Sequence, residues 1–99
     1  MAWPFSTPVS PSFDTGLMAV PDSITVLTPS TVYVLGITVN NPTATSLTFT
    51  VTDTAGSTLI PAMEVPPGLL IPFSFAFEPI VGLKWEASGV GLVGHIWGY

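Results

Sequence analysis

The sequence contains no cysteine and almost no positive charge. Its 99 residues include one Lys or Arg against six Asp or Glu, which gives a formal net charge of −5. Without cysteine, structural disulfides and thiolate metal sites are excluded. Binding to a phosphate backbone requires clustered Lys and Arg, and attraction to an anionic membrane surface has the same requirement. With Lys84 as the single cation, the sequence predicts neither a nucleic-acid partner nor a membrane partner.

Charge of either sign is scarce. Charged residues make up 7% of the chain, whereas soluble domains average about 25%. A length of 99 residues predicts a single domain with one core. A domain this small with so few charges is expected to cover part of its surface with another molecule. We therefore expect a homo-oligomer, or docking on a larger assembly.

The sequence also lacks the marks of a targeting or membrane segment. Its first residues contain neither a basic region nor a continuous apolar region, so no secretory signal is predicted. The longest strongly apolar run, Val65–Phe77, is too short to span a bilayer and contains three prolines. We expect a soluble chain.

Helical periodicity is absent, and from Ile24 onward the apolar residues recur with a period of two. Leu47, Phe49 and Val51 alternate with threonines, which is typical of a strand with one buried face. A second stripe, from Ile71 to Phe77, is expected to point its aromatic rings inward. In the segment 31–40, one face is predicted to carry Tyr33, Leu35, Ile37 and Val39.

Turn signals separate these segments. They are Asn-Asn-Pro at 40–42, Asp-Thr-Ala-Gly at 53–56, Pro-Pro-Gly at 66–68 and Ser-Gly at 88–89. Short strands at regular spacing indicate an all-β fold. We predict a single antiparallel β-sandwich over residues 23–99, immunoglobulin-like, with a jelly roll as the alternative. The expected strands are at about 24–28, 31–40, 46–53, 57–61, 69–77, 82–87 and 91–98.

Residues 1–22 are predicted to form an extended, proline-rich arm. Four prolines forbid a helix and interrupt any central strand. The arm nevertheless carries large apolar side chains, and Trp3, Phe5 and Phe13 are its expected interface residues. Two interpretations stay open: the arm packs on its own domain, or it reaches across to a neighbouring subunit.

The sequence offers no recognisable catalytic, cofactor or metal site, and we expect a protein that is not an enzyme. His95 is the only histidine, with no nucleophile turn and no cluster of further ligands. A carboxylate pair drawn from Glu64, Glu78 and Glu86 is interpreted as charge at solvated edges. We expect His95, Trp97 and Tyr99, on the last strand, to be further interface residues. A pH-sensing role for His95 at an interface is the alternative.

Several features follow one another between Ile37 and Tyr99. They are the Val39-Asn40-Asn41-Pro42 turn, an alternating hairpin at 47–53 that closes at Gly56, the Pro-Pro-Gly turn, an aromatic strand, Gly-Leu-Lys-Trp at 82–85, Ala-Ser-Gly at 87–89 and a final Gly-Tyr. In this combination the last two-thirds of the chain resembles short structural proteins of bacteriophage particles with a β-sandwich fold.

The resemblance implies a role as a head decoration (cement) protein. Such proteins are often trimers on the capsid, with an N-terminal arm that clamps the shell. The implied partner is the major capsid protein or another virion protein, and the implied location is the virion, with the host cytoplasm during assembly. The alternative is a binding module on a tail or fibre that recognises a host glycan. That alternative requires exposed aromatic side chains that form a platform.

Overall fold

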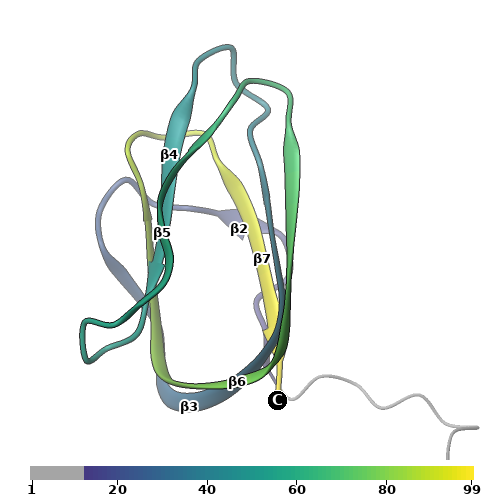
Figure 1. Cartoon of the computed structure of the whole chain (residues 1–99). Coiled ribbons are helices and arrows are strands. Elements are labelled where there is room, and N and C mark those ends of the chain that lie inside the picture. Colours follow the sequence, from purple (N-terminus) through teal and green to yellow (C-terminus); the bar gives the residue numbers. More distant parts are fainter. Residues whose placement is uncertain (1–12) are drawn as a thin grey trace, which may run out of the picture.

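The protein is all-β. The computed structural model describes residues 13–99, with the side chains of residues 76–78 outside the description, and this part of the chain contains no helix. All its strands join one antiparallel sheet, in the order β1-β7-β3-β6-β4-β5, with β2 also paired to β7. The strands are β1 (Phe13–Asp14), β2 (Met18–Ala19), β3 (Thr25–Asn40), β4 (Leu47–Thr52), β5 (Thr58–Val65), β6 (Leu70–Ala87) and β7 (Val93–Gly98) (Figure 1).

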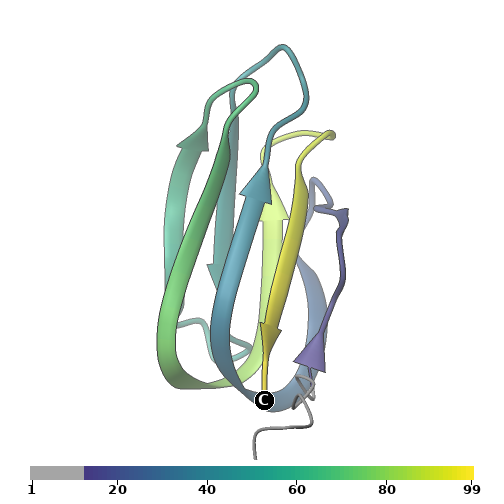
Figure 2. The ribbon, with the colours of Figure 1, turned by 90° about the vertical axis from the view of Figure 1, so that its right-hand side faces the viewer.

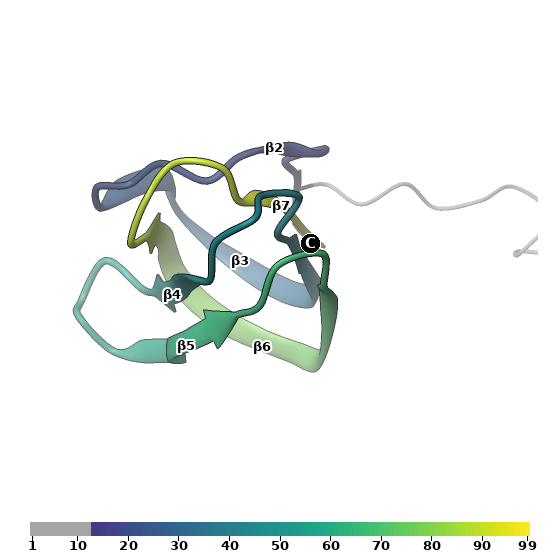
Figure 3. The ribbon, with the colours of Figure 1, turned by 90° about the horizontal axis from the view of Figure 1, so that it is seen from above.

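This one sheet folds over on itself into a β-sandwich, because β3 and β6 run through both layers. The first layer contains β1, β2, β7, the second half of β3 and the first half of β6. The second layer contains the first half of β3, the second half of β6, β4 and β5. Figure 1 shows the two long strands turning together at one end of the molecule, and Figure 3 shows the layers from above. The predicted sandwich is confirmed.

The long strands replace pairs of shorter predicted strands. Segments 24–28 and 31–40 form the single strand β3, and segments 69–77 and 82–87 form β6. Pro29 lies in the predicted gap between the first two segments, where the pairing of β3 with β6 shifts register between Thr28 and Thr31. A bulge of this kind bends a strand and takes up a residue that does not fit the ladder.

A second bulge changes which side chains of β3 face the core. The register shifts between Val34 and Gly36 in both pairings of β3, so the alternation reverses at Leu35. The single predicted face was therefore wrong, and Tyr33 is 48% exposed. The buried residues of this stretch are Val32, Val34, Ile37 and Val39.

The core lies between the two layers and is centred on Trp85. Its indole meets the ring of Phe49 edge to face, with ring centroids 6.2 Å apart. Phe49 and Val51 are buried as the alternation of β4 predicted. Of the expected aromatic stripe in β6, Phe73 and Phe75 are half-buried and pack against the core, while the side chain of Phe77 is outside the described part.

The turn after β3 is held by a fully buried asparagine. The Asn41 side-chain amide donates to the carbonyls of Thr45 and Val65, each at 2.8 Å. Its oxygen accepts from the backbone N–H of Thr43 at 3.0 Å and from the Thr43 hydroxyl at 2.6 Å. Because every polar atom of the side chain has a partner, its burial carries no penalty for unmade hydrogen bonds.

Candidate interaction surfaces

Residues 13–22 of the expected arm lie against the sandwich of their own chain. β1 and β2 both pair with β7 (Figure 2). Between them, Thr15 bonds to both backbone groups of Ile96: its N–H donates to the carbonyl, and its hydroxyl accepts from the N–H, each at 3.0 Å. Phe13 packs against the core. Trp3 and Phe5 lie outside the described residues.

Asp14 and His95 connect β1 to β7 on the outer face of the first layer. His95 Nε2 lies 2.6 Å from Asp14 Oδ1, and both side chains are partly exposed. The same oxygen accepts the backbone N–H of Gly16 at 2.8 Å, in a turn where Gly16 has a φ of 63°. The Gly16 hydrogen bond, followed by the His95 hydrogen bond, lowers the pKa of Asp14 below its ordinary value of 3.8.

This lowered pKa predicts an acid sensitivity specific to Asp14. A carboxyl with a depressed pKa stabilises the fold above its ordinary value, and that stabilisation is lost as the pH falls through the lowered pKa. The wild-type chain should therefore exceed Asp14→Asn in stability at neutral pH, and the difference should shrink below pH 3.8. Urea unfolding at neutral and acidic pH measures it. If the stabilities of the wild type and Asp14→Asn changed with pH in parallel, the prediction would be contradicted. In the His95→Gln variant, Asp14 should keep part of its effect on the pH dependence of stability, because its hydrogen bond from Gly16 remains.

Trp97 lies across the backbone of Gly36 on the same outer face. The two residues are directly opposite in the pairing of β3 with β7. A Cβ at Gly36 would lie 2.7 Å from both Cε2 and Cη2 of the indole, so the absence of a side chain there admits the ring. His95 follows at the next outward position, with its ring 4.9 Å from that of Trp97.

We expect the effect of Gly36→Ala to change sign with residue 97. In the wild-type chain the new methyl group displaces the indole, and overpacking of this kind costs about 1–3 kcal/mol. In a Trp97→Ala background the clash disappears, and alanine in a strand should stabilise by about 0.5–1 kcal/mol relative to glycine. A double-mutant cycle in urea measures the coupling. Equal effects in both backgrounds would show that the ring does not occupy this site.

Tyr99, the third expected interface residue near the end of the chain, follows β7 and lines a groove. Its backbone N–H donates to the carbonyl of Tyr33 at 2.9 Å, and its side chain borders a groove of about 620 Å³. The structure thus brings the rings of His95 and Trp97 together and places Tyr99 at the groove, which Asp14 also lines.

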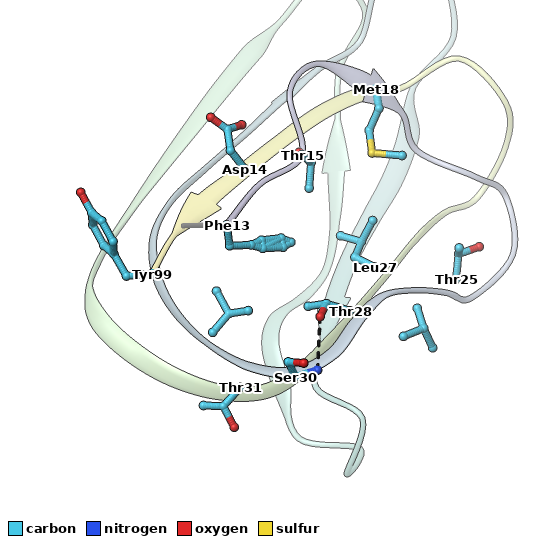
Figure 4. A pocket seen from close by; sticks show the side chains of 12 residues that line it. Phe13, Asp14, Thr15, Met18, Thr25, Leu27, Thr28, Ser30, Thr31 and Tyr99 are labelled. Atoms are coloured by element: carbon cyan, nitrogen blue, oxygen red, sulfur yellow. Dashed lines mark hydrogen bonds between the residues drawn. The ribbon is translucent and has the colours of Figure 1, made fainter. Parts of the chain in front are cut away.

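The groove lies between the β1–β2 segment and the first half of β3 (Figure 4). Apolar side chains, among them Phe13, Met18 and Leu27, share its lining with threonines and Ser30, and Asp14 is the single charged lining residue. Sequence reasoning missed this groove. The available signal was a set of apolar residues, Phe13, Leu17, Met18 and Val20, in the stretch between Pro11 and Pro21.

The titratable side chains do not gather into a site within the described part of the chain. No group of three His, Asp or Glu residues there is placed to hold a metal ion. Glu64 and Glu86 lie on β5 and β6, on opposite sides of β4, and pair with Thr48 and Thr50. The side chain of Glu78 is outside the description.

Exposed aromatic side chains are also few among the described side chains of residues 13–75 and 79–99. Trp85 is buried, Trp97 is partly covered, and Tyr33 is the one aromatic among the large exposed apolar residues. No helix in this part of the chain is long and apolar enough to cross a membrane.

Comparison with known proteins returned no match: no family model, no curated protein and no solved structure matched the chain.

Proposed function

We propose that this chain is a non-enzymatic structural protein of a phage particle, a decoration or cement protein that binds the capsid and stabilises it. The observation that carries the proposal is an apolar exposed surface on a domain with almost no charge. Large apolar residues in contact with water favour a partner surface. Among the described residues they are Leu17, Met18, Ile24, Val26, Tyr33, Leu69, Leu70, Val81 and Val90.

The proposed assembly is a homotrimer in which the sandwich is the exposed body and residues 1–12 make contacts between subunits. Trp3 and Phe5 supply the large apolar groups that usually dominate an interface. The segment has no charged side chain. Its attachment should therefore depend little on salt concentration.

The second candidate function is a tail or fibre module that binds a host glycan. One arrangement on the outer face of the first layer favours this candidate: the Trp97 ring lies beside His95, and His95 contacts the Asp14 carboxylate. Aromatic rings with neighbouring hydrogen-bonding groups are the usual elements of a carbohydrate site. The scarcity of exposed aromatics among the described side chains favours the first candidate.

Electron microscopy of phage particles labelled with antibody against the purified protein tests the proposal. We expect label distributed over the head. Label confined to the tail or its fibres would favour the glycan-binding alternative, and unlabelled particles would contradict both. The position of the gene gives an independent check, because a neighbouring major capsid gene supports the head and neighbouring tail genes support the tail.

A further inference from the structure

The groove has an unpaired strand edge along one side. Residues Thr25–Thr31 of β3 pair with β6 alone, because the pairing of β3 with β7 starts at Val34. Among residues 13–99, the other edge of Thr25–Thr31 has no strand partner. An open edge is a template for the addition of another extended segment. The open edge of Thr25–Thr31 carries no charged residue, and Pro29 is its only residue of a kind that hinders the addition of a strand.

Two exposed apolar side chains line the same groove. They are Met18 and Val26. Leu17 and Ile24 directly precede the lining residues Met18 and Thr25 in the chain. All four belong to the nine large apolar residues that the described surface exposes, and Leu17 is 76% exposed. An unpaired backbone edge next to apolar side chains matches the requirements of an extended apolar segment.

We propose that the groove receives residues 1–12 of a second copy of this chain. That segment has no charged side chain and presents Trp3, Phe5 and Val9 to a groove with one charged lining residue. Its three prolines favour an extended backbone. At about 3.1 Å per residue it would extend over about 37 Å, whereas the seven residues of the open edge extend over about 23 Å. The segment is therefore long enough to cover the groove.

The position of Phe13 favours a second copy over the same chain. Phe13 pairs with Gly98 at the end of β7, and β1 runs antiparallel to β7. β1 therefore begins at the end of β7, where Tyr99 and Thr31 border the groove (Figure 4). A segment that enters its own groove from Phe13 has to reverse the direction of β1, because the groove lies along the β1–β2 segment that follows Phe13. A second copy at that end receives the segment without a reversal.

The absence of cysteine makes a direct cross-linking test available. One chain carries Ser6→Cys, beside Phe5, and a second chain of different mass carries Thr25→Cys in the groove. The matched control chain carries Thr48→Cys, which changes an exposed threonine on β4. The variants are mixed, oxidised mildly and separated by mass. We expect the disulfide-linked heterodimer to form at least tenfold more with Thr25→Cys than with Thr48→Cys.

Further variants separate the outcomes. Adding Trp3→Ala and Phe5→Ala to the Ser6→Cys chain should reduce the cross-link about tenfold, and Thr31→Cys repeats the test if Thr25→Cys does not fold. A chain with both Ser6→Cys and Thr25→Cys that closes an internal disulfide at high dilution would overturn the proposal, because the segment would then occupy its own groove. Equal cross-linking of groove and control positions would overturn it too. The test uses purified protein, so its result is independent of the proposed role in a phage particle.

Discussion

Trp85→Ala is expected to remove most of the stability of the domain. Trp85 is 1% exposed and is the largest fully buried side chain. Truncating a buried tryptophan costs about 3–5 kcal/mol, whereas the whole free energy of unfolding of a small domain is about 5–15 kcal/mol. For a domain of this length, the loss corresponds to a fall in Tm of about 12 °C or more. Thermal and urea unfolding followed by circular dichroism measure it.

Trp85→Phe is the matched control. It keeps an aromatic ring beside Phe49 and removes the Trp85 Nε1 donor, which is buried without a hydrogen-bond partner among the described residues. An unpaired buried donor destabilises the fold by about 1–3 kcal/mol. Because Trp85→Phe removes that donor, the variant regains part of the stability that it loses through poorer packing. We expect the phenylalanine variant to lose less than half of the stability that the alanine variant loses. Similar losses in both variants would show that ring packing is not the main contribution of Trp85.

Removal of residues 1–12 is expected to leave a folded domain that no longer self-associates or attaches to its assembly. The seven strands and the buried core that the structure describes lie within residues 13–99, so the truncation retains them. The truncation deletes Trp3 and Phe5. Interface aromatics often contribute about 2 kcal/mol or more each, which corresponds to at least about 30-fold in affinity for one of them. Sedimentation velocity at several concentrations measures the change.

Circular dichroism and the urea midpoint of the truncated chain provide the control for folding. The full-length chain carrying Pro4→Ala tests a milder change, because it keeps both aromatics and loses only part of the preference for an extended backbone. We expect it to self-associate more weakly than wild type and more strongly than the truncated chain. A truncated chain that still self-associates normally, or that cannot fold, would show that residues 1–12 are not the anchor.

The sequence predicted most of the fold because its strongest signals are local. The alternation of Leu47 to Thr52 and the glycine of the 53–56 turn each depend on a few neighbouring residues, and β4 and its hairpin agree with the prediction. The continuity of β3 through Pro29 depends on a register shift against β6, which is far away in the sequence. A period-two pattern contains no information about such a bulge.

The candidate surfaces were harder to predict because they combine distant residues. The Asp14–His95 contact joins residues 81 positions apart, and neither neighbourhood identifies the other. Gly36 was not singled out, since its role depends on the indole that faces it across the strand pair. Asn41 was recognised as a turn residue. Its burial among four hydrogen bonds follows from the approach of Val65, which only the folded sheet reveals.

The place of β7 in the sheet has a consequence for biosynthesis. β7 is translated after the other described strands, yet it lies between β3 and the β1–β2 segment. Until it emerges from the ribosome, β1 and β2 have nothing to pair with, and the second half of β3 presents a bare backbone edge. The 52 residues between Asn40, where β3 ends, and Val93, where β7 begins, take roughly 3–10 s to synthesise at about 5–20 residues per second. During that interval the nascent chain exposes apolar strands, and prematurely terminated products that lack β7 are expected to aggregate.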